Sequence, residues 1–374
     1  MRCSQSLRNR VYFELMSHYG LKIRVVFAAI LLSGFVSLQA FAVSVETLRV
    51  ATWNTHDLFE STPNGVPDIA DSVNFTPSSW RRWTEARYQS QITNLATVIS
   101  VMKPDILFVQ EVAGSNVLHH LTHVLRTLPE GAIDYPYIAH RKSPDRRGID
   151  VALISRYPIK SYDLKIPVSG MRGALVVQID VDETDVYGIV NHWKSWVGDE
   201  KSNVAIRMKE AQGVRKEALA ILTEKPDATL FIAGDFNDNL DGDSLVKGLK
   251  AFPTRDAVSQ VTDDTVFYNV LGELPKDKLG SYYYARRRVW NTFDAILVTQ
   301  QMLLPIDSPG PAWRLPPSGK TTVETFRYPA MVGPDGRPMP SQRTRIGGTD
   351  EYVLGYSDHF PVYADFIRGN VVKK

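Results

Sequence analysis

The sequence predicts a mixed α/β fold, a four-layer α/β/β/α sandwich in which two mixed sheets pack together and helices cover their outer faces. First, short apolar runs alternate with helical patterns from Leu48 onward, which is typical of helices layered on sheets. Second, a unit of helix, Lys-Pro-Asp and apolar strand occurs twice, around residues 103–105 and 225–227. Third, polar residues follow some predicted strands and precede others, so that one shared site requires strands of both directions.

Apolar runs predict eight strands, at 48–53, 106–109, 151–155, 175–181, 186–190, 229–233, 293–299 and 361–366. Three helices are predicted at 79–102, 116–128 and 204–224. The first and third helices end before Lys-Pro-Asp, because the residue before a proline avoids the helical conformation. Residues 300–350 are rich in proline and glycine, and we expect them to form a long loop inserted in the domain.

The first 42 residues have the pattern of a secretory signal peptide. Basic residues precede an apolar run over 25–42, which closes on the small-x-small pattern Ala40-Phe41-Ala42. This run is near the lower length limit for spanning a bilayer, and no later stretch is apolar enough to span one. We therefore expect a secreted or periplasmic monomer with one domain over 43–374 and no stable membrane span after cleavage. The alternative is an uncleaved anchor, since the basic region is long.

Composition excludes several classes of protein. With 44% hydrophobic and 22% charged residues the chain is neither disordered nor fibrous. The formal charge of +2 becomes −2 without the leader, so that contact with a polyanion requires a local basic patch. The only cysteine, Cys3, lies in the leader. Disulfides, cysteine-zinc sites and thiol nucleophiles are therefore excluded from the mature chain.

Reactive side chains gather at the ends of the predicted strands. Four sets follow strands, namely Asn54, Gln110-Glu111, Asn191-His192 and Asp235 with Asn237 and Asp238, whereas Asp294 and the pair Asp358-His359 precede strands. If all six sets meet in one site, the last two strands run antiparallel to the others. This arrangement disfavours a parallel sheet of the Rossmann type.

The residue types in these sets suit metal-assisted hydrolysis of phosphoesters. Oxygen ligands such as those of Glu111, Asp235 and Asp358 suit Mg2+, Mn2+ or Ca2+ better than zinc. A divalent ion neutralises charge that grows on a phosphoryl oxygen while a base activates water. Asn54 and Asn237 can hold a phosphate or water oxygen without adding charge, and histidine moves protons at physiological pH.

Six short motifs in order resemble those of the endonuclease/exonuclease/phosphatase superfamily, which has the DNase I-like fold. They are Trp53-Asn54, Gln110-Glu111, Asn191-His192, Gly234-Asp235-Phe236-Asn237, Phe293-Asp294 and Ser357-Asp358-His359. Each motif alone is weak, but six in order at predicted strand ends are a strong signal over nearly the whole mature chain. The runs 190–195 and 281–284 are similar to those of bacterial extracellular nucleases in this superfamily.

The resemblance implies a divalent metal site and a water-activating group. Glu111 would be the main metal ligand, Asn54 would help to hold the metal-bound phosphate or water, and Asp358 would lie by the ion. Mg2+ is the first candidate, with Mn2+ and Ca2+ as alternatives. Asp235 would position or deprotonate the attacking water, and Asn237 would orient the phosphate.

The resemblance also implies roles in proton transfer for two histidines. Asp294 would accept a hydrogen bond from His359 and fix the tautomer of its ring. His192 would donate a proton to the leaving group or stabilise the pentacovalent phosphate, and which histidine acts as acid and which as base stays open. Asp150 is the candidate carboxylate for supporting His192.

These features favour an exported, metal-dependent phosphodiesterase acting on DNA or RNA. Lys194 and Arg287, with the neighbouring Arg286 and Arg288, are candidates for phosphate contacts, and the interleaved tyrosines 282–284 could stack on bases. An exposed hairpin with ordinary charges is equally compatible. One alternative is a sphingomyelinase-like phospholipid hydrolase or a phosphomonoesterase with the same catalytic set. A more remote alternative is an inactive binding protein on the same scaffold.

Overall fold

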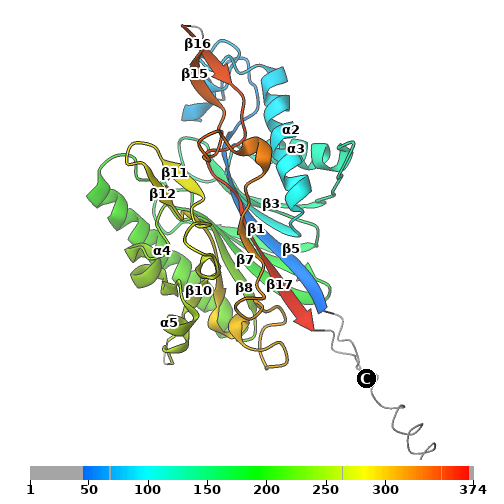
Figure 1. Cartoon of the computed structure of the whole chain (residues 1–374), viewed down its shortest axis with the longest axis vertical. Helices are drawn as coiled ribbons and strands as arrows, with labels where there is room; N and C mark the ends of the chain where they lie inside the picture. Colours follow the sequence, from blue (N-terminus) through cyan, green and yellow to red (C-terminus); the bar gives the residue numbers. More distant parts are fainter. Residues whose placement is uncertain (1–44, 67–68, 263, 347, 370–374) are drawn as a thin grey trace, which may run out of the picture. The chain divides into compact units, whose positions relative to one another are not determined.

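A computed structural model describes residues 45–66, 69–262, 264–346 and 348–369 (Figure 1). The predicted signal peptide over 1–42, with Cys3, lies outside the described residues. Within the described part of the chain, every helix is too short or too polar to span a lipid bilayer.

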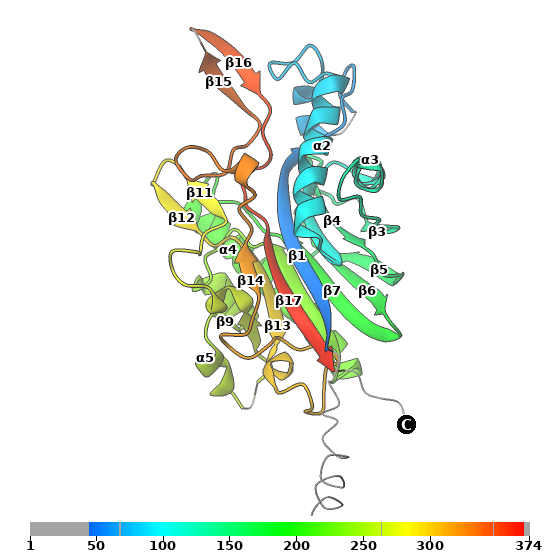
Figure 2. The same ribbon diagram turned by 45° about the vertical axis from the view of Figure 1, so that its right-hand side comes forward.

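The first sheet is mixed and has six strands. In spatial order they are β14 (Val323–Thr325), β17 (Val362–Gly369), β1 (Val45–Leu58), β2 (Ile106–Val112), β4 (Asp150–Ser155) and β3 (Tyr137–His140). Strand β1 pairs parallel with β2 and antiparallel with β17, so that the last strand of the domain lies beside the first. Figure 2 shows these two strands, blue and red, running side by side.

The second sheet is also mixed and has seven strands. In order they are β5 (Ile159–Lys165), β6 (Ala174–Val181), β7 (Thr184–His192), β8 (Thr229–Asp235), β13 (Asp294–Thr299), β10 (Phe267–Asn269) and β9 (Ala251–Phe252). Strand β8 is parallel to β7 and antiparallel to β13. Both sheets therefore contain the two strand directions that a shared site requires.

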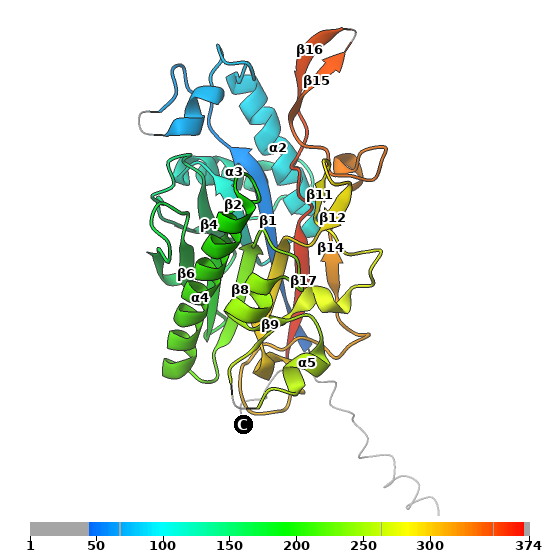
Figure 3. The same ribbon diagram turned by 90° about the vertical axis from the view of Figure 1, so that its left-hand side faces the viewer.

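Helices cover the outer face of each sheet. Helices α2 (Glu85–Met102) and α3 (Ser115–Thr127) lie on one side, and α4 (Glu200–Glu224) and α5 (Arg255–Ser259) lie on the other (Figure 2). Figure 3 shows α4 lying along the second sheet. The predicted four-layer sandwich is therefore confirmed.

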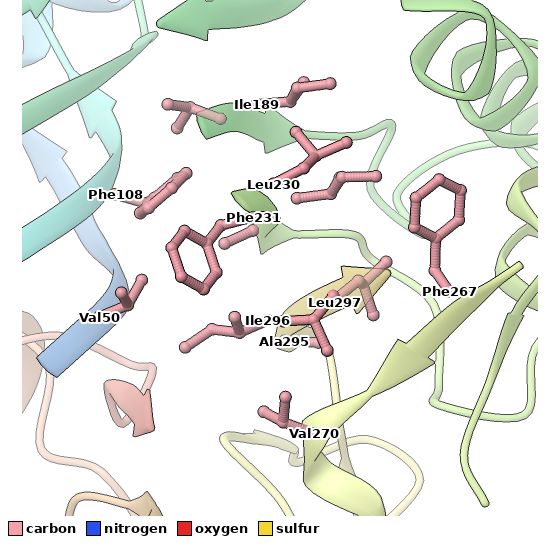
Figure 4. Packing of buried hydrophobic residues seen from close by; sticks show 14 of the residues in the cluster. Val50, Phe108, Ile189, Leu230, Phe231, Phe267, Val270, Ala295, Ile296 and Leu297 are labelled. Atoms are coloured by element: carbon pink, nitrogen blue, oxygen red, sulfur yellow. The ribbon is translucent and has the colours of Figure 1, made fainter. Parts of the chain in front are cut away.

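Alternation along the strands explains the layers, because successive strand side chains point to opposite faces. Val50 of β1 and Phe108 of β2 are buried in the core between the sheets, where Phe231 of β8 packs (Figure 4). Ala51 and Trp53 alternate with Val50 and are buried against α2 and α3.

The helix boundaries follow local capping chemistry. Helix α2 begins at Glu85 rather than at 79, because the Thr84 side chain accepts a hydrogen bond from the Arg87 N–H and closes the first turn. The helix ends at Lys103, which has a left-handed backbone with φ 53° before the proline. Helix α4 begins earlier than expected, because Asp199 caps the N–H of Ser202.

The expectation of a long loop over 300–350 is wrong in part. This stretch forms β14 on the edge of the first sheet, the hairpin of β15 (Gln342–Ile346) and β16 (Thr349–Val353), and the short helical turns η4 (Gln300–Leu303) and η5 (Pro329–Met331). The prolines fall outside the paired strands. A second hairpin of β11 (Tyr282–Tyr284) and β12 (Val289–Asn291) precedes β13. These strands are short and polar, and therefore give weak sequence patterns.

Candidate active site

The packing of the two sheets brings the predicted site residues together. Within the first sheet Asn54 lies opposite Gln110, and within the second sheet Asp235 lies opposite both His192 and Asp294. The Asn54 Nδ2 group then donates a 3.0 Å hydrogen bond across the sheets to Asp235 Oδ2. The strand ends of both sheets therefore contribute to one cluster.

Sharp backbone turns aim these side chains. Glu111 has φ 62° and lies at a bulge in β2, and Asn237 has φ 47° directly after β8. Such conformations cost non-glycine residues about 1 kcal/mol or more, and bulges next to active sites re-aim side chains. At Gly234 a Cβ would overlap the carbonyl of Asn191. Glycine thus allows β8 to approach β7 just before Asp235.

His359 and Asp294 form a buried pair. His359 Nδ1 lies 2.7 Å from Asp294 Oδ2, and His359 Nε2 lies 3.9 Å from Asp235 Oδ2. The ring packs on Tyr282 with 4.6 Å between centroids. Burial opposes a charge on His359, but the carboxylates of Asp294 and Asp235 raise its pKa well above the usual value. The surroundings of His359 therefore favour its protonated form.

His192 is in the opposite state. Its Nε2 lies 3.6 Å from Asp235 Oδ2 and 3.7 Å from Glu111 Oε1. Burial, together with the cations of Arg172 and Arg147, lowers the pKa of His192 well below its usual value. The surroundings therefore favour the neutral form of His192 and the protonated form of His359, and both rings lie near Asp235 Oδ2.

Asp150 lies beside a different histidine from the one expected. Its Oδ2 is 2.9 Å from His140 Nε2, and its Oδ1 accepts a 2.9 Å hydrogen bond from the N–H of Ser143. Among the described residues, His192 Nδ1 has no hydrogen-bond partner. The interpretation of Asp150 as the support of His192 is corrected accordingly, because both oxygens of its carboxylate are engaged by His140 and Ser143.

Carboxylates beside Glu111 create a site for a cation. The Glu111 Oε2 atom accepts a 2.9 Å hydrogen bond from the N–H of Asp57. Burial and the negative charge of Asp57 raise the pKa of Glu111 to about 7. Burial also disfavours the charge of Asp358, but His56, 2.9 Å away, and His359 lower its pKa below the usual range. The carboxylate oxygens of Glu111 and Asp358 are the donor type that a hard divalent cation prefers.

The side chain of Asn54 is engaged at both ends. Its Nδ2 donates to Asp235, and its Oδ1 accepts a 3.0 Å hydrogen bond from the N–H of His56. A carbonyl oxygen has two lone pairs, so one remains for a metal-bound oxygen or an ion. Asn54 thus connects the Glu111 side of the cluster to Asp235.

Asp235, Asp294 and His359 also offer ligand atoms that all lie within 4.8 Å of one another. An ion bound by all three would compete for atoms that already form the Asp294–His359 hydrogen bond. We therefore interpret these three residues as a proton-transfer group and the carboxylates of Glu111 and Asp358 as the metal ligands.

The sequence model of the Endonuclease/Exonuclease/phosphatase family matches residues 49–368. The chain belongs to this family. It is accordingly a metal-dependent hydrolase of phosphodiesters, which agrees with the cluster of acidic residues and histidines between the sheets.

Solved structures of family proteins share the fold. TDP2 from C. elegans is 16% identical, with a TM-score of 0.51 over 90% of this chain and 83% of that one. A double mutant of beta toxin from Staphylococcus aureus with bound magnesium ions is 15% identical, with a TM-score of 0.51 over 85% and 99%. A family protein from Bacteroides thetaiotaomicron is 14% identical, with a TM-score of 0.50 over 88% and 98%. A search of curated proteins gave no sequence match.

Three residues near the family's catalytic cluster escaped the sequence interpretation. His56 contacts Asp358, Asp57 donates its N–H to Glu111, and Arg147 lies 3.1 Å from Asp57 Oδ1. The positions of His56 and Asp57 directly after Asn54 were the available signal. For Arg147 the signal was a run of basic residues at 141–147 on a loop near the expected rim of the site, and its approach to Asp57 depends on how the loop before β4 folds back.

The two candidate phosphate contacts lie beyond this cluster. The Lys194 ammonium donates a 3.1 Å hydrogen bond to the carbonyl of Val197. The Arg287 guanidinium lies 3.5 Å from Glu200 and 5.5 Å from the ring centroid of Trp196. Both side chains therefore belong to the surface around the loop after β7, at the start of α4.

Proposed function

We propose that this protein is an exported nuclease that hydrolyses phosphodiester bonds in DNA or RNA with Mg2+ as its metal. The observation that carries the choice of substrate is a pocket of about 490 Å³ beside Asp358, whose lining includes Tyr282, Tyr283 and Arg337. The Arg337 guanidinium lies 3.8 Å from the centroid of Tyr283. Aromatic rings and a cation next to the reacting group suit a chain of bases and phosphates.

The described residues support separate roles for Asp235, the two histidines and the metal ligands at the scissile phosphate. Asp235 Oδ1 accepts a 2.8 Å hydrogen bond from the N–H of Asn237, and Oδ2 accepts one from Asn54. A carboxylate oxygen has a second lone pair, with which Oδ2 can orient and deprotonate the attacking water. Burial raises the pKa of Asp235 to about 6, so that this carboxylate is mostly ionised at neutral pH yet basic enough to accept a proton.

Both histidines present Nε2 to the same part of the cluster, 3.6 and 3.9 Å from Asp235 Oδ2. His359, charged and fixed through Nδ1, can donate its Nε2–H to a phosphoryl or leaving oxygen. His192, neutral and within 3.7 Å of Glu111, can form a neutral hydrogen bond to the phosphate. A divalent ion held by Glu111 and Asp358, with Asn54 alongside, supplies charge neutralisation at the phosphoryl oxygen when bound.

A phospholipid substrate is the second candidate. Val289 and Trp290 on β12 are 41% and 36% exposed, which favours contact with a lipid surface. The turn of the same hairpin, however, consists of Ala285 followed by three arginines, 286–288. Charged residues are costly to insert among acyl chains, and this turn therefore favours a polyanion.

The test is a substrate panel with purified protein and Mg2+, Mn2+ or Ca2+. We expect plasmid to be nicked and EDTA to stop the reaction. Single-stranded DNA, RNA, sphingomyelin vesicles and phosphate monoesters complete the panel. Faster turnover of sphingomyelin than of every nucleic acid would overturn the nuclease proposal and leave the hydrolase assignment intact.

Export is tested separately, in cells. The leader pattern places the cleavage site after Ala42, so that we expect the extracellular or periplasmic protein to begin at Val43 by mass spectrometry. A full-length chain recovered only from membranes would instead show that the leader is an anchor.

A further inference from the structure

A second pocket lies between the start of α4 and the β11–β12 hairpin, which are neighbours in Figures 1 and 3. Its volume is about 430 Å³, and its lining includes Trp196, Asn203, Arg207, Tyr284, Arg286 and Arg287. We call it the hairpin pocket. Three cations, two aromatic rings and one carboxylate, that of the exposed Glu200, therefore surround one cavity beside the catalytic cluster.

The buried guanidinium of Arg207 is a candidate anion-binding group in this pocket. Its side chain is 4% exposed, yet the one hydrogen bond found for it among the described residues runs from Nη1 to the carbonyl of Lys194, at 3.0 Å. Its Nε has no hydrogen-bond partner there, and the carboxylates of Asp238, Glu210 and Glu200 act on Arg207 through the electrostatic field and not through a hydrogen bond. Burial lowers the pKa of Arg207. A buried cation without a paired anion is costly, and an anionic ligand would offset that cost.

The other walls suit a planar, anionic ligand. Trp196 and Tyr284 lie edge to face, with 6.1 Å between ring centroids. Arg287 lies 5.5 Å from the centroid of Trp196, and its only carboxylate contact among the described residues is at 3.5 Å to the exposed Glu200. A nucleobase could stack against the rings while its phosphate contacts the arginines.

A hydrogen bond and a ring contact connect the pocket to the catalytic cluster. Trp196 Nε1 donates a 2.7 Å hydrogen bond to the carbonyl of Asn237, whose own N–H binds Asp235. On the hairpin, Tyr282 packs on His359 and Tyr284 follows on the same side of β11. Two residues of strand span about 6.6 Å. Tyr284 is therefore offset along the hairpin from Tyr282, the ring that packs on His359.

We propose that the hairpin pocket binds the nucleotide next to the scissile phosphodiester, with its phosphate at Arg207, Arg286 and Arg287 and its base against Trp196 and Tyr284. This inference rests on the proposed nuclease function and extends it. It makes the preferred substrate an oligonucleotide or longer strand rather than a small diester. The contacts use features that DNA and RNA share.

The first test measures binding without turnover. Fluorescence anisotropy in EDTA would compare an octathymidylate with thymidine monophosphate, using wild type, the Arg286→Ala/Arg287→Ala variant and Tyr284→Ala. The control Arg126→Ala/Lys216→Ala removes two exposed cations elsewhere. We expect the arginine variant to bind the octamer about tenfold more weakly or worse, with a shallower salt dependence. Tyr284→Ala should weaken binding about tenfold without changing the salt slope.

The second test compares substrates. With Mg2+, kcat/KM of the arginine variant should fall at least tenfold more on the octamer than on bis(4-nitrophenyl) phosphate, which has no flanking nucleotide. Equal losses of kcat/KM on both substrates would overturn the proposal that the hairpin pocket binds a nucleotide. The same holds if the arginine variant binds the octamer as tightly as the control variant does. If the wild type hydrolyses the small diester but no nucleic acid, the proposed function itself fails. Melting curves establish that each variant is folded.

Discussion

Asp294 Oδ2 and His359 Nδ1 lie 2.7 Å apart although 65 positions separate the residues in the chain and their strands belong to different sheets. This contact fixes which ring nitrogen faces the carboxylate. The other nitrogen, Nε2, then faces Asp235. The contact therefore couples the packing of the two sheets to proton transfer.

Replacing Asp294 with asparagine tests the role of its negative charge, because the side chain keeps nearly the same size and shape. We expect Asp294→Asn to lower kcat on plasmid by about a hundredfold or more, because the amide neither stabilises the imidazolium nor fixes its tautomer. His359→Ala should lose at least as much. Steady-state kinetics with melting curves check both, and Asp277→Asn, on an exposed loop, is the control. A variant with full kcat would show that the pair has only a structural role.

Glu111→Gln should abolish metal binding and lower the rate more than about a hundredfold. The pKa of Glu111 is about 7 in the folded, metal-free protein and 4.5 in the unfolded chain. The fold therefore favours the protonated form, and its free energy of unfolding decreases as the pH rises from 4.5 to 7. Ions bind the deprotonated carboxylate, so that Mg2+ should raise the Tm more at pH 8 than at pH 6.

Calorimetry of the wild type and Glu111→Gln with and without Mg2+ checks this prediction. The variant should show no Mg2+-dependent rise in Tm at either pH. An equal rise in both proteins would place the ion elsewhere, for instance among Asp235, Asp294 and His359.

Asp150→Asn should act on stability. Its carboxylate accepts hydrogen bonds from Ser143 and lies 2.9 Å from His140. Loss of the buried charge should lower the free energy of unfolding by about 1–3 kcal/mol, with kcat changed less than by Asp294→Asn. Urea unfolding and kinetics on the same preparation measure the two effects. A loss of kcat as large as that of Asp294→Asn, in a stable protein, would restore the catalytic interpretation.

Glu210 should make stability depend on pH. Its carboxylate accepts a 2.8 Å hydrogen bond from the N–H of Lys194, and burial raises its pKa to about 7 from 4.5. The raised pKa means that the fold favours the protonated form, so that stability falls as pH rises from about 4.5 to 7. The full shift corresponds to roughly 3 kcal/mol.

The variant Glu210→Gln removes this titration while keeping the size of the side chain. Relative to wild type, its free energy of unfolding should rise as pH increases from 5 to 8. Urea unfolding across this range, with Glu217→Gln farther along α4 as the control, measures the difference. A difference that does not change with pH would show that Glu210 is ionised throughout.

Much of the scaffold was predictable from local patterns. The eight predicted strands are present. Apolar runs such as those of β8 and β13 are predictable because all of their side chains must be buried, and a strand in the middle of a sheet buries both of its faces. The weaker elements gave no such pattern. Strand β14, for example, is three residues long and forms on the edge offered by β17, and the proline-rich composition around it predicted a loop.

Apolar patterns and the six short motifs were enough to predict the fold, the family and the residues at the strand ends, because side-chain alternation and the order of motifs are read along the chain. Only the tertiary structure decided which partners these residues take. Asp150 lies beside His140, His56 contacts Asp358, and Arg207 is buried in a pocket with two aromatic rings. Such pairings depend on bulges and loop paths that bring distant segments within a few ångströms, and no local pattern encodes those distances.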